Sequence, residues 1–268
     1  MPALCCIVTC KGRLEHLRQT LPGIAKWPDV EVVVVDYDCP QQSARWVRVA
    51  HPAVKTVRVE DRPTFNLSAA RNLGAQAAAG DWLLFLDADT LAAPDLPGHL
   101  TPLMRPGVFA VAEPGAPQLW GALLVSRADF ARLEGYDEAI EGWGSEDEDM
   151  IERLIDTGLE RTTFTSDLLT PIPHDDRLRT EHYAVKDRTA NNRLNHLYRR
   201  VKRDLALLNV SLPLESRRSL YRQLRPVVFG GSANSVEISF RRSALGERVV
   251  LSSLKYDLVP AEAAAVPR

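Results

Sequence analysis

The chain has 268 residues and a formal net charge of −2 at pH 7. This length suits one large α/β domain, or one such domain with an extension. Its hydrophobic share of 45% and charged share of 25% are those of a soluble globular protein. The near-neutral charge excludes a general attraction to nucleic acid, so we expect no nucleic-acid partner.

No segment approaches the roughly 20 apolar residues that span a bilayer, and no basic region precedes the N-terminal apolar run. We therefore expect a cytoplasmic protein. The four cysteines have neither zinc-ligand spacing nor the pattern of a disulfide framework, which indicates buried, reduced thiols. They are Cys5, Cys6, Cys10 and Cys39.

Apolar runs alternate with amphipathic segments through the first ninety residues. Asn66 offers an N-cap side chain to an Ala-rich helix that Gly80 ends. Strands separated by helices indicate a mostly parallel, doubly wound sheet, in which ligands bind beyond the carboxyl ends of the strands. The expected elements are strands at 4–9, 30–35, 54–59 and 82–86, and helices at 14–24 and 69–79.

The strand at 82–86 ends in two carboxylates one residue apart, Asp87 and Asp89. Side chains at i and i+2 of an extended chain project to the same side and can hold one divalent cation. Aspartate is also common in turns, so the triplet alone favours an ordinary strand end. The surrounding sequence has to decide between the two.

A second acidic stretch, Gly-Trp-Gly-Ser-Glu-Asp-Glu-Asp, occupies residues 142–149. Ser145 and Glu148 have capping-box spacing, and an apolar helical face follows until Gly158. Glu146 and Asp147 then lie in the first turn, where the helix dipole favours the ionised form that a base requires. Solvated capping acids are the alternative, but capping does not call for a tryptophan between two glycines.

Between the two acidic stretches, a Pro-rich loop at 93–106 leads to expected strands at 108–112 and 120–125 and a short helix at 126–135. Residues 176–225 are predicted to be mainly helical and basic. A helix with a solvated cationic face is the ordinary interpretation, and peripheral contact with anionic lipid or an acidic acceptor is the alternative. Strand-like runs at 236–240 and 249–251 precede an Ala/Pro-rich end that we expect to fray.

Together, Phe-Leu-Asp-Ala-Asp-Thr at 85–90 and the stretch at 142–149 resemble the GT-A nucleotide-sugar glycosyltransferases. The N-terminal part looks like the family 2 enzymes. The segment from about 120 to 149 looks like the galactosyltransferase module shared by β-1,4-galactosyltransferases and polypeptide N-acetylgalactosaminyltransferases. The resemblance covers roughly residues 3–190.

The resemblance implies an α/β, GT-A nucleotide-sugar-binding (Rossmann-like) fold, with a mostly parallel mixed sheet flanked by helices. It implies a catalytic domain at 1–175, with a nucleotide-sugar half at about 1–92 and an acceptor half at about 93–175. A basic helical and β extension follows at 176–268.

The resemblance also assigns roles to individual residues. Asp147 matches the general base of inverting enzymes. Asp89 and His174 match the ligands of Mn²⁺ or Mg²⁺, with Asp87 as a further candidate and His182 as the fallback. Donor or nucleotide contacts are implied for Thr9, Lys11, Arg13, Asp36, Phe65, Asn66, Arg71, Asp87, Ala88 and Asp89, and acceptor or sugar contacts for Trp120, Gly121, Trp143, Gly144 and Glu146.

These roles imply a metal-dependent, inverting transfer from a UDP-sugar to a hydroxyl of a glycan or glycolipid acceptor. Related retaining enzymes carry Asn where this chain has Asp147, so the acid favours inversion. Trp120-Gly121 stands where the family has a Gly-Gly pair, which is expected to reshape the donor pocket.

Two other functions fit part of the sequence. A sugar-phosphate nucleotidyltransferase would need a glycine-rich loop after the first strand, where only Gly12 is present. A non-catalytic nucleotide-sugar-binding or scaffold subunit of a polysaccharide-assembly complex would dock through the basic region. The intact Asp87, Asp89 and Asp147 argue against that degenerate role.

Overall fold

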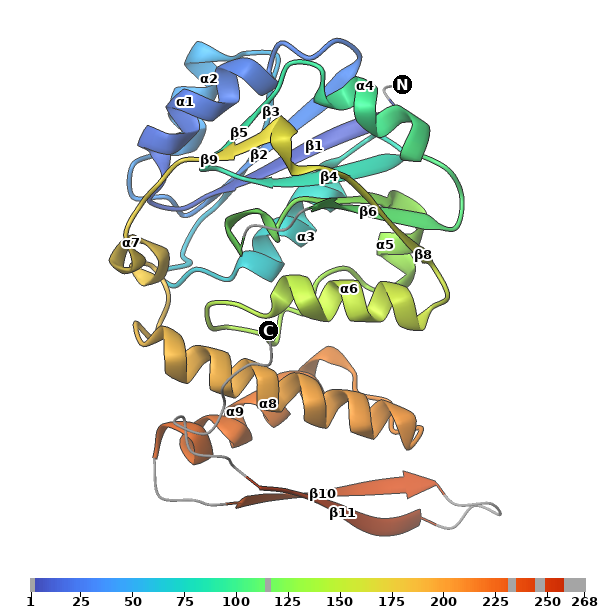
Figure 1. The fold of residues 1–268 in the computed structure, drawn as a ribbon. Helices are drawn as coiled ribbons and strands as arrows, with labels where there is room; N and C mark the ends of the chain where they lie inside the picture. Colours follow the sequence, from blue (N-terminus) through green and yellow to red (C-terminus); the bar gives the residue numbers. More distant parts are fainter. Residues whose placement is uncertain (1–2, 114–116, 231–234, 244–248, 258–268) are drawn as a thin grey trace. The chain divides into compact units, whose positions relative to one another are not determined.

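The computed structural model describes residues 3–113, 117–230, 235–243 and 249–257 (Figure 1). The chain divides into two compact units, Met1–Lys186 and Asp187–Arg268. The sequence indicated a domain boundary after residue 175, but residues 176–186 belong to the first unit and are hydrogen-bonded to it. The Arg13 guanidinium donates to the Leu178 carbonyl at 2.8 Å, and the Phe65 N–H donates to the His182 carbonyl at 2.7 Å.

A seven-stranded sheet forms the centre of the first unit, in the order β3-β2-β1-β4-β7-β6-β8. Only β7 runs antiparallel to both of its neighbours, so the sheet is mixed and mostly parallel, as predicted. A small second sheet pairs β5 with β9. The strands are β1 (Leu4–Cys10), β2 (Val30–Tyr37), β3 (Lys55–Val59), β4 (Trp82–Asp87), β5 (Thr90–Ala92), β6 (Val108–Glu113), β7 (Leu123–Ser126), β8 (Glu160–Thr165) and β9 (Leu169–Pro171).

Helices cover both faces of this sheet (Figure 1). The Asn66 side chain caps α3 by accepting from the Ala69 N–H at 2.9 Å, as the sequence predicted. The helices of the first unit are α1 (Leu14–Ile24), α2 (Ser43–Ala50), α3 (Leu67–Ala77), α4 (Leu96–Leu100), α5 (Arg127–Arg132), α6 (Glu146–Asp156) and α7 (Asp176–Thr180), with single 3₁₀ turns η1 (Thr101–Leu103), η2 (Pro117–Leu119) and η3 (Ser166–Leu168).

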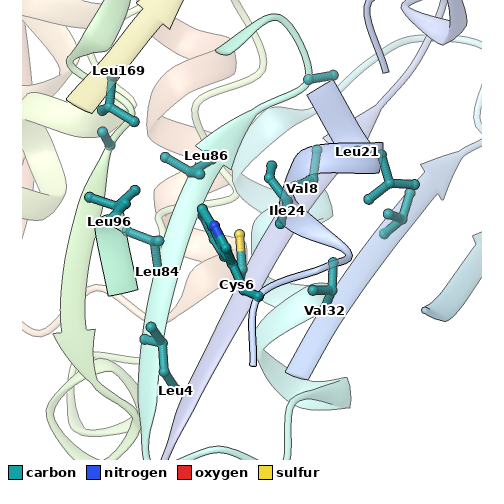
Figure 2. Packing of buried hydrophobic residues seen from close by; sticks show 14 of the residues in the cluster. Leu4, Cys6, Val8, Leu21, Ile24, Val32, Leu84, Leu86, Leu96 and Leu169 are labelled. Carbon is teal, nitrogen blue, oxygen red and sulfur yellow. The ribbon is translucent and has the colours of Figure 1, made fainter. Parts of the chain in front are cut away.

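The apolar runs of β1 and β4 are continuous because both faces of these strands are buried. Figure 2 shows one of the two resulting layers, in which Cys6 and Val8 of β1 lie beside Leu84 and Leu86 of β4. The alternate residues of the same strands face the second layer, on the side of α3. All four cysteines are buried and free, which confirms their interpretation as buried thiols.

Two local predictions were wrong. The strand expected from residue 120 begins at Leu123, because Trp120 and Gly121 form a turn after η2. The capping box at the start of α6 does not form. Ser145 adopts a left-handed conformation with φ 70°, and its side chain makes no capping hydrogen bond.

The second unit, described by itself, consists of α8 (Arg188–Leu207), α9 (Leu214–Phe229) and a hairpin of β10 (Ser235–Ser243) and β11 (Val249–Asp257). The Tyr221 hydroxyl donates to the Asn195 side-chain oxygen at 2.7 Å and joins the two helices. The helical character predicted for this region is confirmed, whereas the Ala/Pro-rich end lies outside the described residues. Within the described ranges, no helix has both the length and the apolar character needed to cross a bilayer.

Candidate active site

A cavity lies at the carboxyl ends of β1 and β4, where the strand order reverses. Three segments supply most of its wall: the loop after β1, the turn after β4 and a stretch after residue 173. The cavity gathers most of the residues that the resemblance assigned to the donor and the metal. Its lining residues are Thr9, Lys11, Arg13, Phe65, Leu67, Asp87, Ala88, Asp89, Trp143, His174, Leu178, Arg179, His182 and Tyr183.

The short β5–β9 sheet brings Asp89 and His174 together. The Ile172 N–H donates to the Asp89 carbonyl at 2.7 Å and extends this pairing towards the histidine. His174 Nδ1 lies 3.0 Å from the Ile172 carbonyl oxygen, which fixes a proton on Nδ1. In the neutral ring, Nε2 therefore presents a lone pair to Asp89 Oδ2, 3.4 Å away.

His174 Nε2 and the Asp89 carboxylate are the two groups here that a divalent cation would share. Burial raises the pKa of Asp89, Asp87 adds to the shift, and His174 and Arg13 oppose it. The described residues contain no group of three or more His, Cys, Asp or Glu that could hold a metal ion. One carboxylate and one imidazole suit Mn²⁺, provided that a bound diphosphate and water complete the coordination.

Arg71 joins the two acidic motifs. Its guanidinium is 1% exposed and lies 3.1 Å from Asp87 Oδ1 and 2.5 Å from Asp147 Oδ1. The Asp87 side chain thus contacts the arginine, whereas Asp89 contacts the histidine. Gly121 packs against this ion pair, and a Cβ added there would lie 2.5 Å from Arg71 Nη2. The glycine that the resemblance assigned to sugar contact is therefore also required by packing.

Glu146 and Asp147 form a buried pair of acids at the start of α6. Burial, and then the neighbouring Asp147 carboxylate, raise the pKa of Glu146 to about 8. Burial also raises the pKa of Asp147, and the Arg71 guanidinium opposes that shift. The Asp147 carboxylate accepts a hydrogen bond from the Glu146 side chain. Near neutral pH, the pair therefore holds its proton on Glu146 and its negative charge on Asp147.

Asp147 also borders a second cavity, formed by α6, β6 and the turn before β7. Trp120 contributes a side chain that is 50% exposed, and Ile151 contributes an apolar side chain. Arg161 and Glu113 form an ion pair on the same wall. Through Arg71, Asp147 connects this second cavity with Asp87 in the first.

Two predicted donor residues act on the protein itself. The Lys11 ammonium is buried and donates to the carbonyls of Tyr37, Asp38 and Arg62 at 3.1, 2.8 and 2.7 Å. These bonds use its three N–H donors. The Asp36 side chain is fully buried and accepts from the N–H groups that follow β2.

Asn66, another predicted donor contact, does not line the cavity but holds the neighbouring backbone in place. Its oxygen caps α3, and its amide donates to the Glu138 carbonyl at 2.9 Å. Trp143 lines the donor cavity, whereas the next residue, Gly144, supplies a positive φ of 89°. The loop before α6 therefore combines an aromatic side chain with a backbone that favours glycine.

Of the cavity-lining residues after 176, the sequence named only His182, as a fallback metal ligand, and missed Leu178, Arg179 and Tyr183. The Tyr183 ring packs on the Phe65 ring, with centroids 5.5 Å apart. His182 lies so close to Gly12 that a Cβ on the glycine would be 1.8 Å from the imidazole Nε2. The clustered charged and aromatic residues after His174 were a signal, but placing the domain boundary at 175 separated them from the site.

Two family descriptions match consecutive parts of the chain. Residues 5–116 match glycosyl transferase family 2, and residues 115–175 match the N-terminal domain of galactosyltransferase. Xylosylprotein 4-beta-galactosyltransferase of Caenorhabditis elegans is 25% identical over 173 residues, covering 59% of this chain and 52% of the relative. The chain is a distant homologue of the β-1,4-galactosyltransferases.

Human beta-1,4-galactosyltransferase 2 is 26% identical over 171 residues, covering 56% of this chain and 45% of the relative. The chain thus spans about half the length of the curated relatives it matches. The predicted combination of a family 2 N-terminal part with a galactosyltransferase-type module is confirmed.

Solved structures confirm the GT-A-like fold. TarS of S. aureus, in complex with UDP-GlcNAc, matches with a TM-score of 0.58 and 14% identity, covering 85% of this chain and 73% of that one. The mannosyltransferase PcManGT from Pyrobaculum calidifontis, in complex with GDP-Man and Mn²⁺, matches with a TM-score of 0.56, 18% identity and the same coverage. Drosophila beta1,4galactosyltransferase 7, in complex with xylobiose, matches with a TM-score of 0.52 and 20% identity, covering 72% of this chain and 79% of that one.

Proposed function

We propose that this protein is a metal-dependent, inverting glycosyltransferase that moves a sugar from a UDP-sugar to a hydroxyl of a glycan or glycolipid. The observation that carries the proposal is the position of Asp147, which borders one cavity and is joined through Arg71 to the acidic turn of the other. The names of the similar proteins support a nucleotide-sugar donor, since TarS is described with UDP-GlcNAc and PcManGT with GDP-Man.

Asp89 and His174 would hold the cation, and Mn²⁺ is described with PcManGT. When bound, the divalent cation neutralises the charge that develops on the leaving diphosphate. Arg13 and Arg179 line the same cavity and add positive charge around that position. The cation and the two guanidinium groups together favour departure of the nucleoside diphosphate.

Asp147 would take the proton from the attacking hydroxyl. An alcohol is a weak nucleophile near neutral pH, and a positioned base contributes typically ~10²–10⁴ in rate. Arg71 orients this carboxylate and opposes the rise in its pKa that burial causes. Attack on the face opposite the diphosphate inverts the anomeric centre.

The second cavity would hold the acceptor. Its exposed Trp120 ring offers an apolar face of the kind on which a sugar ring stacks, and Arg161 and Glu113 offer hydrogen-bonding groups beside it. A glycan or the sugar of a glycolipid has both apolar faces and hydroxyl groups. This chemistry favours a carbohydrate acceptor over an entirely apolar molecule.

The full chain should be incubated with a panel of UDP-sugars, Mn²⁺ and candidate glycans, and the product examined by NMR for its anomeric configuration. We expect inversion, loss of transfer in Asp147→Asn with donor binding retained, and loss of metal-dependent donor binding in Asp89→Ala. Asp156→Asn, at the other end of α6, is the matched control. Absence of donor binding with and without metal, in both wild type and Asp89→Ala, contradicts the proposal.

Two other outcomes of this experiment have specific meanings. Retention of configuration would favour a retaining transferase of the same fold. Normal donor binding with transfer unaffected by Asp147→Asn in an assembled complex would favour a non-catalytic subunit. The ionised, arginine-held Asp147 supports catalysis, since a binding subunit has no need for a buried base.

For the second unit we propose peripheral contact with the inner face of a membrane, in a cytoplasmic protein. The supporting observation is the basic composition of α8 and α9, which includes Arg200 and Lys202. Binding to vesicles containing phosphatidylglycerol should decrease as the salt concentration rises, because salt screens exposed charges beyond about 10 Å at 0.1 M. Equal binding to neutral phosphatidylcholine vesicles would refute the contact.

A further inference from the structure

Two of the four cysteines meet beside the donor cavity. Cys10 is the last residue of β1, and Cys39 follows β2, the parallel neighbour of β1. Both side chains are buried, with 0% of Cys10 and 3% of Cys39 exposed. Both side chains belong to the same buried apolar cluster, and the proximity of the two thiol groups raises the pKa of Cys10 and lowers that of Cys39. The topology of the sheet thus places a dithiol pair directly before the Lys11–Arg13 loop.

A backbone donor points at the Cys39 sulfur. The Gly12 N–H donates to Cys39 Sγ at 3.3 Å. The neighbouring Cys10 thiol, and then the Gly12 N–H, lower the pKa of Cys39 to about 5 against the effect of burial. Cys39 is therefore a thiolate near neutral pH, and Cys10 retains the proton that it donates.

The other two cysteines lack this environment. Burial raises the pKa of both Cys5 and Cys6 far above the usual range of a thiol. Cys5 Sγ donates to the Cys6 carbonyl at 4.0 Å, and the nearby Glu31 carboxylate adds to the rise in the pKa of Cys5. Since the thiolate is the nucleophile, Cys5 and Cys6 are inert and serve as internal controls.

We propose that Cys10 and Cys39 form a redox-active dithiol that a peroxide oxidises to an intramolecular disulfide. The Cys39 thiolate attacks one oxygen of the peroxide, the O–O bond breaks, and hydroxide leaves and takes up a proton to form water. The Cys10 thiol then attacks the sulfenic acid sulfur, the S–S bond forms and a second water leaves. The peroxide is reduced by two electrons, and the dithiol is oxidised by the same two. Because both sulfurs are almost fully buried, the oxidant must be small, as hydrogen peroxide is.

Oxidation changes the loop that borders the donor cavity. In the reduced protein the Gly12 N–H donates to a charged sulfur, and in the disulfide that acceptor has lost its charge. Gly12 lies between Lys11 and Arg13, which both line the cavity. The disulfide is therefore expected to weaken binding of UDP by about tenfold, the size of one lost hydrogen bond to a charged group. This second step rests on the proposed function, whereas disulfide formation does not.

Peptide mapping tests the dithiol directly. The full chain is treated with hydrogen peroxide, alkylated without reduction and digested with trypsin, which places Cys10 in peptide 1–11 and Cys39 in peptide 27–45. We expect a linked pair of peptides that a dithiol reductant separates. A fragment ion cleaved between Thr9 and Cys10 assigns the bond to Cys10 in the wild-type protein. Absence of the linked pair, or linkage through Cys5 or Cys6, overturns the proposal.

Variants and a second readout complete the test. Cys6→Ala should still form the link, whereas Cys10→Ser should leave Cys39 to oxidise without it. Hydrogen exchange at the Gly12 amide should accelerate on oxidation of the wild type, and this readout requires no nucleotide. A disulfide that leaves both Gly12 exchange and UDP affinity unchanged overturns the coupling to the loop. If the disulfide forms and Gly12 exchange changes, but the reduced protein does not bind UDP, the dithiol proposal stands and only the proposed function is contradicted.

Discussion

The buried acid pair at the start of α6 gives the stability of the protein a specific dependence on pH. Glu146 is 7% exposed, and its pKa is raised from 4.5 to about 8. Between these two values the unfolded chain has lost a proton that the folded protein keeps. The free energy of unfolding from this group is therefore largest below pH 4.5 and falls as the pH rises towards 8.

Glu146→Gln removes this effect while keeping the shape and a donor for Asp147. A single group that titrates between two such pKa values changes the free energy of unfolding by roughly 1 kcal/mol per pH unit. We expect the variant to have the same free energy of unfolding as the wild type near pH 4.5. At pH 8 its free energy of unfolding should be higher by several kcal/mol, on the order of the change per pH unit multiplied by the pH range between the two pKa values.

Urea denaturation of both proteins at several pH values between 5 and 8 measures the difference. The comparison cancels the titration of every group that does not interact with Glu146. If the wild type and Glu146→Gln lose stability in parallel across this range, Glu146 keeps an ordinary pKa and the argument for its protonation is wrong. Asp147→Asn is a poor substitute, because it removes the partner of Arg71 as well.

Further predictions concern the donor cavity and the Arg71 ion pair beside it. Gly121→Ala should lower the free energy of unfolding by about 1–3 kcal/mol, because its Cβ would lie 2.5 Å from Arg71 Nη2; a denaturation midpoint equal to that of the wild type would contradict the packing. His174→Ala should raise the Mn²⁺ concentration that half-activates transfer by more than about tenfold; an unchanged Mn²⁺ titration would remove the histidine from the metal site. In calorimetry, Lys11→Met should lower the affinities for uridine and for UDP equally, since its ammonium is committed to three protein carbonyls and we expect it not to contact the diphosphate. Arg13→Met should lower the affinity for UDP more than the affinity for uridine. If Lys11→Met also lowers UDP affinity more than uridine affinity, the supporting role of Lys11 is refuted.

The strands and the general place of the site were predictable from local sequence. A continuous apolar run ending in Asp87 specifies a buried strand with polar groups at its carboxyl end, and the structure has that strand as β4. Asn66 was predictable as a cap for the same reason, because the interaction with the Ala69 N–H spans three residues. Strand patterns and helix caps are set by residues close in the sequence, so they can be predicted without knowing the fold.

The parts that could not be predicted depend on contacts between distant residues. Strands β5 and β9 have only three residues each, and neither carries a strand pattern, yet their pairing sets His174 beside Asp89. The capping box failed because Ser145 takes a positive φ in place of the extended conformation typical of an N-cap residue.

Arg71 shows why the two acidic motifs form one site. Asp87 and Asp147 are 60 residues apart in the sequence, and each alone fits an ordinary turn or helix start. Two ionised carboxylates around one buried position repel each other, and their burial is costly unless a cation is shared between them. The guanidinium, 1% exposed, pairs with both carboxylates and lowers the cost of placing them together. Burial and the neighbouring Asp147 raise the pKa of the third acid, Glu146, which keeps its proton instead. One fixed cation thus sorts three acids into two carboxylates and one carboxylic acid, which makes Asp147 the acid best prepared to accept a proton.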